Sequence, residues 1–152
     1  MGSEYFQQVV VEYLRSSRSR FVNSECLIQL DADVTKKQRH WYCDFMTIDF
    51  SNSTVYLCEV TFSRTLQSLL KRLTAWELNW AEIAAAIHRD CRIPTEWHIT
   101  PWVFVPEASA EIMSTKLAQL PNGIPPRMPA PIITTLESVL PWKYRSWNGI
   151  PY

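Results

Sequence analysis

Residues 41–63, WYCDFMTIDFSNSTVYLCEVTFS, contain two runs of apolar and β-branched residues separated by the polar triplet Ser-Asn-Ser. Such runs are typical of β-strands, and the triplet is typical of the turn between two of them. The stretch therefore predicts a β-hairpin with strands over 41–50 and 54–62. Each strand also carries a carboxylate, Asp44 in the first and Glu59 in the second. Because a buried carboxylate is costly unless a positive group compensates it, these two acids are the first candidates for a functional site.

The segments on either side of the hairpin predict an α/β domain, because apolar residues recur at helical spacing in some of them and alternate in others. In chain order we expect a helix, three strands, a long helix, a strand and a helix, over 4–17, 25–34, 41–50, 54–62, 65–89, 98–105 and 107–120. Three consecutive strands favour an antiparallel meander, and the long helix can serve as the crossover to a parallel fourth strand. The predicted architecture is a mixed sheet flanked by helices. Pro101 in the fourth strand indicates a sheet edge or a bulge.

The C-terminal segment 121–152 is rich in proline and has little periodicity. We therefore expect a single domain over 1–120 and an extension that packs on the domain or extends from it, with a short helix near 134–140. Within the extension, PWKYRSW at 141–147 mixes aromatic and basic side chains. That mixture indicates either a surface for nucleic acid or a protein partner, or a tail that covers the core.

The composition is that of a globular protein, with 152 residues, 47% hydrophobic and 20% charged. Lys+Arg and Asp+Glu both total 15, which argues against a nonspecific nucleic-acid coat but leaves a local basic groove open. The four cysteines form no C-x-x-C pair, which argues against zinc and against a disulfide framework. The chain contains neither a signal-peptide pattern nor a run of about 20 apolar residues. We therefore expect a soluble protein of the reducing cytoplasm that has no membrane partner.

Several nucleotide-binding and catalytic motifs are absent from the sequence. Glycine occurs only at positions 2, 123 and 149, which excludes the glycine-rich loop of a P-loop or Rossmann site. No G-x-S-x-G nucleophile motif is present. The histidines lie at no metal-ligand spacing. The acids of the hairpin thus remain the main candidates.

These two acids are predicted to be neighbours. Antiparallel pairing around the turn places position 44 opposite about position 60, so Asp44 and Glu59 approach each other. Two adjacent carboxylates repel unless one is protonated or a cation lies between them. A different interpretation is a pair of acids on a half-solvated face that are matched to Arg or Lys side chains.

Asp44, fourteen intervening residues and then Glu59-Val60-Thr61 at the end of an apolar strand resemble the signature of the PD-(D/E)xK nuclease superfamily. The predicted element order over 4–106 is also similar to that superfamily's core. The resemblance implies a restriction-endonuclease-like fold of order α-β-β-β-α-β, a Mg²⁺ or Mn²⁺ site, and hydrolysis of phosphodiester bonds in DNA or RNA. It further implies that Asp44 and Glu59 bind the metal, with Glu12 of the first helix as a third ligand. A homodimer with paired active sites would suit the cutting of duplexes.

The chain departs from this signature at two positions. Thr61 stands where the family has a lysine, and Cys43 instead of proline precedes Asp44. The family's lysine positions or activates the attacking water, whereas a threonine hydroxyl can hold a water but carries no charge. Four basic residues are candidates for the replacement cation: Lys71, Arg64, Lys36 and Lys37.

Two functions therefore stay open at the level of the sequence. The first is a metal-dependent nuclease with Asp44, Glu59 and Thr61 as its catalytic residues, and the retention of both acids favours it. The second is a catalytically inactive module of the same fold that binds nucleic acid or a protein partner. The missing lysine and the zero net charge favour the second function.

Overall fold

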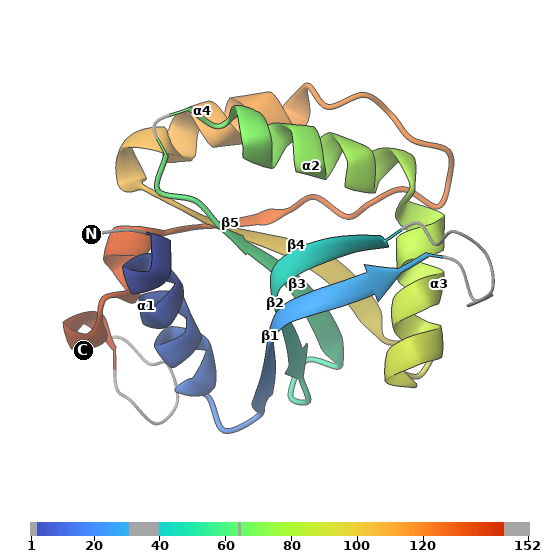
Figure 1. Cartoon of the computed structure of the whole chain (residues 1–152), viewed down its shortest axis with the longest axis horizontal. Coiled ribbons are helices and arrows are strands. Elements are labelled where there is room, and N and C mark those ends of the chain that lie inside the picture. The colour runs from blue at the N-terminus through green and yellow to red at the C-terminus, as the bar shows by residue number, and fades with distance from the viewer. Residues whose placement is uncertain (1–2, 31–39, 64, 145–152) are drawn as a thin grey trace.

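The computed structural model describes residues 3–30, 40–63 and 65–144 (Figure 1). In order, its helices and strands are α1 (Ser3–Arg15), β1 (Arg20–Gln29), β2 (His40–Asp49), β3 (Thr54–Val60), α2 (Gln67–Leu78), α3 (Trp80–Cys91), β4 (His98–Val105), α4 (Glu107–Ala118) and β5 (Ile132–Thr135). Two short 3₁₀ helices follow, η1 (Leu136–Val139) and η2 (Pro141–Lys143). The predicted α/β architecture, a mixed sheet with helices on its faces, is confirmed.

Within the described ranges the strands form one open sheet in the order β1-β2-β3-β4-β5. The first three strands are an antiparallel meander, while β4 runs parallel to β3 and β5 runs parallel to β4. The predicted meander and the parallel crossover are therefore both confirmed. Pairing between β4 and β5 begins at Trp102, directly after Pro101, so the part of β4 that contains the proline pairs only with β3. A residue without an N–H is tolerated at such an edge.

The single long helix expected over 65–89 is wrong, because α2 and α3 are separate helices that meet at Asn79. The Asn79 side chain donates a hydrogen bond from Nδ2 to the Ala75 carbonyl oxygen at 2.8 Å. Asparagine competes in this way with the regular helical hydrogen bonds. The break allows α2 to lie along the sheet while α3 runs in a different direction, as Figure 1 shows. Both helices thereby bury their apolar faces.

The first strand begins earlier than predicted, at Arg20 and not at residue 25. Its first half, residues 20–24, does not alternate between polar and apolar residues, so it gives no strand pattern in the sequence. Pairing with β2 nevertheless extends to Arg20↔Asp49, and Arg20 Nε donates to Asp49 Oδ2 at 3.1 Å. The partner strand therefore determines where β1 begins. The expected end of this strand, at residues 31–34, lies outside the described residues.

The sheet separates two apolar clusters. One cluster contains residues of α2, α3 and α4, and the other contains residues of α1 and η1; Figure 1 shows α2 and α4 on one side of the sheet and α1 on the other. In β3, Val55 and Leu57 pack in the first cluster, whereas Tyr56 and Cys58 pack in the second. Glu59 follows Leu57 by two residues and therefore belongs to the face that α2 covers.

The C-terminal extension crosses the domain. Met128 packs in the cluster under α2, and Leu136 and Val139 of η1 pack in the cluster under α1. At Gly123 the chain passes so close to α2 that a Cβ would collide with the Glu77 carbonyl oxygen. Strand β5 was not predicted, whereas the short helix expected near 134–140 is present as η1. Among the described helices, none has the length and apolar character required to span a bilayer.

Candidate functional site

The pairing of β2 with β3 brings the two predicted acids together. The outermost pair of the ladder is Phe45↔Cys58, so Asp44 and Glu59 occupy the next opposed positions. The Val60 backbone N–H donates to Asp44 Oδ2 at 2.9 Å, which holds the Asp44 carboxylate against the end of β3. There it lies close enough to the Glu59 carboxyl to raise the pKa of that group. The predicted proximity of Asp44 and Glu59 is confirmed, and their role as metal ligands stays a prediction.

A bend in β1 and β2 makes this contact possible. Residues two apart on a strand normally share a face, yet Cys43 packs in the cluster under α2 and Phe45 in the cluster under α1. In β1, which pairs with β2, the side chains change sides in the same region, because Val22 and Cys26 also pack in different clusters. Figure 1 shows both strands turning sharply part-way along their length. Asp44 lies at this bend, where its side chain remains half-buried.

Glu59 is fully buried and only partly compensated. Arg72 Nη1 donates to Glu59 Oε2 at 2.6 Å, while Glu59 Oε1 has no hydrogen-bond partner among the described residues. Burial and the nearby Asp44 carboxyl raise the pKa of Glu59 to about 9, against the opposing effect of Arg72. The carboxyl therefore carries a proton at neutral pH unless a further cation is present. A site with this shortage of positive charge suits a divalent metal ion.

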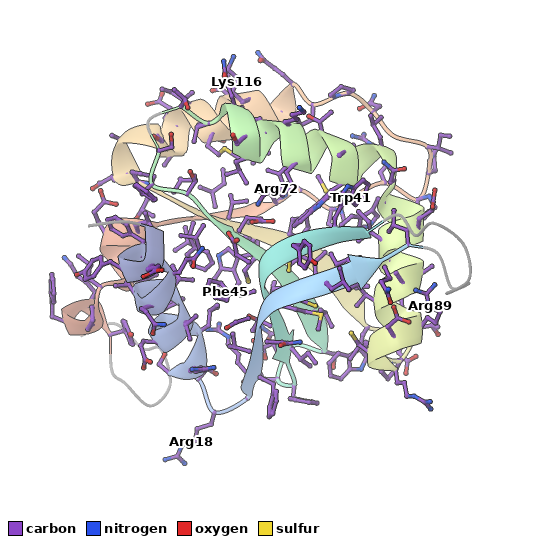
Figure 2. All side chains as sticks on the ribbon, in the orientation of Figure 1. Arg18, Trp41, Phe45, Arg72, Arg89 and Lys116 are labelled. Carbon is purple, nitrogen blue, oxygen red and sulfur yellow. The ribbon has the colours of Figure 1, made fainter. Side chains whose placement is uncertain are left out.

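Arg72 is the cation that the sequence analysis missed. It lies on the flank of the apolar face of α2, between Leu69 and Trp76 in the helical pattern, so its stem can run along apolar surface while its head reaches Glu59. Figure 2 shows Arg72 between α2 and the sheet. A basic residue at the edge of an apolar stripe, opposite a buried acid, is the signal that could have identified it.

The other predicted site residues lie as follows. Thr61 Oγ1 accepts a hydrogen bond from the Ser63 backbone N–H at 3.3 Å, within the loop after β3. Glu12 is exposed on α1 and lies near Tyr144, whose pKa is raised by burial and then by the Glu12 charge. Lys71 is exposed on α2. Arg64, Lys36 and Lys37 lie outside the described residues.

Two open hollows flank the acid pair. The hollow on the α2 side has a volume of about 320 Å³ and is lined by Trp41, Ser68, Lys71, Arg72, Ala75 and Trp76. The hollow on the α1 side has a volume of about 400 Å³ and is lined by Glu4, Gln7, Gln8, Val11, Arg15, Ser24, Asp44 and Phe45. Glu12 is not among these residues, so the structure does not place it beside Asp44. No group of three or more His, Cys, Asp or Glu side chains is arranged to hold a metal in the ranges that the structure describes.

The aromatic and basic segment near the C-terminus is only partly described. Trp142 and Lys143 are exposed on η2, whereas Tyr144 is buried with its ring 5.3 Å from that of Tyr13. Arg145 and Trp147 lie outside the described residues. The beginning of the segment thus combines an exposed surface with a residue that anchors it to α1.

A scan of the chain against models of known protein families finds no match, and no curated protein matches the sequence. The function of the site is therefore inferred from its own geometry.

Proposed function

We propose that this protein is a divalent-metal-dependent nuclease that hydrolyses phosphodiester bonds of DNA or RNA. The observation that carries the proposal is the buried Glu59 carboxyl, which has one unpaired oxygen, lies beside Asp44 and is held by Arg72 on its other oxygen. Perturbed carboxyl groups of this kind cluster at functional sites.

The arrangement of elements supports the proposal. The order α1, the meander β1 to β3, the α2–α3 crossover and the parallel strand β4 is similar to the core expected for the PD-(D/E)xK superfamily, with α1 and α2 on opposite faces. Asp44 and Glu59 occupy the second and third strands, as the signature requires. The restriction-endonuclease-like fold is thus part of the proposal.

The acid pair fits a hard divalent cation. Mg²⁺ is usually bound by one or two carboxylates, with waters and substrate phosphates as the remaining ligands. Asp44 and the unpaired Glu59 Oε1 would hold the ion, because both offer carboxylate oxygen at one place. When bound, Mg²⁺ or Mn²⁺ would polarise a phosphate oxygen and lower the pKa of a coordinated water. Glu12 is not needed for this ligand set.

Arg72 compensates for the lysine that Thr61 replaces. Its bond to Glu59 Oε2 orients the carboxyl and would leave Oε1 for the metal. Its charge would stabilise a phosphate bound at the acid pair. Because a guanidinium does not lose its proton in proteins, Arg72 acts through charge and orientation and not as a base. The Thr61 hydroxyl can still hold a water.

The test is cleavage of labelled single- and double-stranded DNA and RNA in Mg²⁺ or Mn²⁺. We expect Glu59→Gln and Asp44→Asn each to lower the rate about a hundredfold or more, the scale on which such groups stabilise transition states. Glu77→Gln is the matched control: Glu77 is also a buried glutamate with an arginine partner, since Arg127 Nε donates to its Oε1 at 2.9 Å. Unchanged cleavage in both acid-pair variants would refute the proposal.

The second candidate is a module that binds nucleic acid or a protein partner without catalysis. It is favoured by the ion pair of 2.6 Å between Arg72 and Glu59, which would serve as a structural contact. The lack of a third acid beside the pair, among the described residues, favours it too. If the wild type cleaves no substrate while its circular dichroism is that of a folded protein, this second function is the correct one.

A further inference from the structure

Two buried side-chain atoms without a hydrogen-bond partner lie close to one surface of α2. In the part of the chain that the structure covers, Glu59 Oε1 and Trp76 Nε1 are the buried side-chain nitrogen and oxygen atoms left unpaired. Trp76 lines the hollow on the α2 side, and Glu59 contacts Arg72, which lines the same hollow. Buried polar groups are nearly always paired, so unpaired ones call for an explanation such as an absent ligand, ion or water. The unpaired Trp76 N–H is a donor and points to a ligand in this hollow that accepts hydrogen bonds, whereas Glu59 Oε1 is itself an acceptor and is left to the proposed metal.

The side chains of the hollow suit an anion. Ser68, Lys71, Arg72 and Ala75 have the spacing i, i+3, i+4 and i+7, which places them on one side of α2. Among the described residues that line the hollow, none is an acid. Ammonium, guanidinium and indole N–H groups only donate hydrogen bonds, and the Ser68 hydroxyl can also donate. A group that only accepts hydrogen bonds and carries negative charge, such as a phosphodiester, matches this set.

Trp41 adds a stacking surface to the cations. It lies at the start of β2, is half-buried, and forms the wall of the hollow that faces α2 (Figure 2). An indole face stacks on any nucleobase, with little dependence on its identity. In a duplex each base face is already covered by its neighbours, so a side chain in a hollow of about 320 Å³ is suited to an unpaired base.

We propose that this hollow binds single-stranded nucleic acid, with Lys71 and Arg72 contacting a backbone phosphate and Trp41 stacking on an adjoining base. The inference rests on the proposed function, because it specifies the strand form of the substrate. In this arrangement Arg72 would contact both the phosphate and Glu59. The chain's zero net charge is compatible with this site, since the fold gathers two cations at a hollow whose described lining contains no acid.

The test is binding without catalysis. Fluorescence anisotropy of an end-labelled single strand of about 12 nucleotides, a typical site size, is measured in EDTA, so that neither metal nor cleavage contributes. We expect Lys71→Gln to weaken binding about threefold to tenfold and to lower the slope of log K against log salt by about one. Trp41→Leu should weaken binding at least fivefold, whereas Trp41→Phe, which keeps an aromatic face, should retain most of it.

Two variants serve as matched controls. Lys116→Gln removes an exposed lysine on α4, and Phe21→Leu removes an exposed aromatic ring on β1. Both should bind within about twofold of the wild type, because neither residue lines the hollow. A duplex of the same length should bind at least tenfold more weakly than the single strand.

Three outcomes would overturn the inference: wild-type protein that binds no oligonucleotide, equal losses in the control variants, or tighter binding to the duplex. If binding depends on Lys71 and Trp41 but no cleavage occurs with Mg²⁺ or Mn²⁺, this inference stands and the nuclease proposal falls. The two failures are therefore distinguishable.

Discussion

Glu59 and Glu77 are both buried glutamates with an arginine partner, and the comparison shows what distinguishes the candidate site. Glu77 Oε1 accepts hydrogen bonds from Arg127 Nε and from the Gly123 backbone N–H. In the part of the chain that the structure describes, Glu59 has a single donor, Arg72, and the acid Asp44 is a further neighbour. Glu77 is thus compensated by the fold, whereas at Glu59 the single Arg72 charge faces two carboxyl groups, those of Glu59 and Asp44. A buried carboxyl whose pKa is raised by a second carboxyl is more typical of a functional site than of a stabilising contact.

The raised pKa of Glu59 predicts an unusual dependence of stability on pH. An unfolded glutamate titrates near 4.5 and folded Glu59 near 9. Between these values the folded state binds the extra proton, so the free energy of unfolding falls as pH rises, by at most about 1.4 kcal/mol per pH unit. Glutamine does not titrate, so Glu59→Gln removes this decrease in the free energy of unfolding. We therefore expect the variant to gain stability relative to the wild type from pH 5 to pH 9 in urea denaturation with EDTA.

The comparison variant for this pH series is Glu77→Gln, which replaces a second buried glutamate, one whose Oε1 accepts two hydrogen bonds. Parallel curves for Glu59→Gln and the wild type would show that Glu59 is ionised in the folded protein, and the proposed shortage of charge would then be wrong.

The hairpin of β2 and β3 sets the register on which the site depends. At the turn, Asp49 accepts hydrogen bonds from the Ser51 backbone N–H at 3.0 Å, from Ser51 Oγ at 2.7 Å and from Arg20 Nε at 3.1 Å. These contacts fix the end of β2, and the ladder then runs from Asp49↔Thr54 to Phe45↔Cys58. A slip of one residue would turn Asp44 to the other face of the sheet. The turn at one end of the hairpin thus positions the acids at the other.

Asp49→Asn should destabilise the protein by about 1–3 kcal/mol at pH 7, because it weakens a buried, charge-assisted network. Burial alone would raise the pKa of Asp49, but hydrogen bonds from Ser51 and Arg20 outweigh burial and lower it. This stabilisation is fully present above the ordinary pKa of 3.8 and is lost as pH falls through the lowered value. The difference between wild type and variant should therefore shrink at acid pH.

Asp90→Asn is the control for this second series. The Asp90 side chain is 48% exposed and pairs with the adjacent Arg89, so its loss should cost less than about 1 kcal/mol. Urea denaturation of both variants at pH 7 and at pH 3 provides the comparison. Equal destabilisation by the two substitutions at pH 7 would show that Asp49 does not anchor the turn.

At the scale of the whole molecule, the proline-rich extension contributes to both cores. Met128 packs under α2, Leu136 and Val139 pack under α1, and β5 pairs with β4. Each buried side chain of this size stabilises a fold by about 1.5–3 kcal/mol. Together they are comparable with the entire stability of a typical domain, about 5–15 kcal/mol. The extension is therefore structurally part of the domain in the described residues.

A chain that ends at residue 120, the domain boundary expected from the sequence, should fail to fold cooperatively. It would expose both apolar clusters and the β4 edge, so we expect aggregation or the loss of a sigmoidal urea transition. A chain that ends at residue 144 keeps every described element and is the control. Cooperative unfolding of the shorter chain, with its stability intact, would show that residues 1–120 are a domain by themselves.

Much of the fold could be predicted from local patterns. Alternation and helical spacing located α1, the hairpin, β4 and α4, and the length of the crossover predicted the parallel pairing of β4 with β3. The helix break at Asn79 is a local effect of its side chain, whereas the errors in the strands occur where a partner strand overrides the pattern. The start of β1 is a strand because β2 pairs with it, and β5 is a strand because β4 offers a free edge.

The sequence by itself determined the order of elements and the proximity of Asp44 and Glu59, because a period of two and the position of a turn are local properties. Only the tertiary structure decided which cation reaches Glu59. Neighbouring residues on a helix point about 100° apart, so the choice of Arg72 over Lys71 depends on how α2 packs against the sheet. The bend at Asp44 and the burial of Glu59 were decided in the same way, because both arise from packing between segments far apart in the chain.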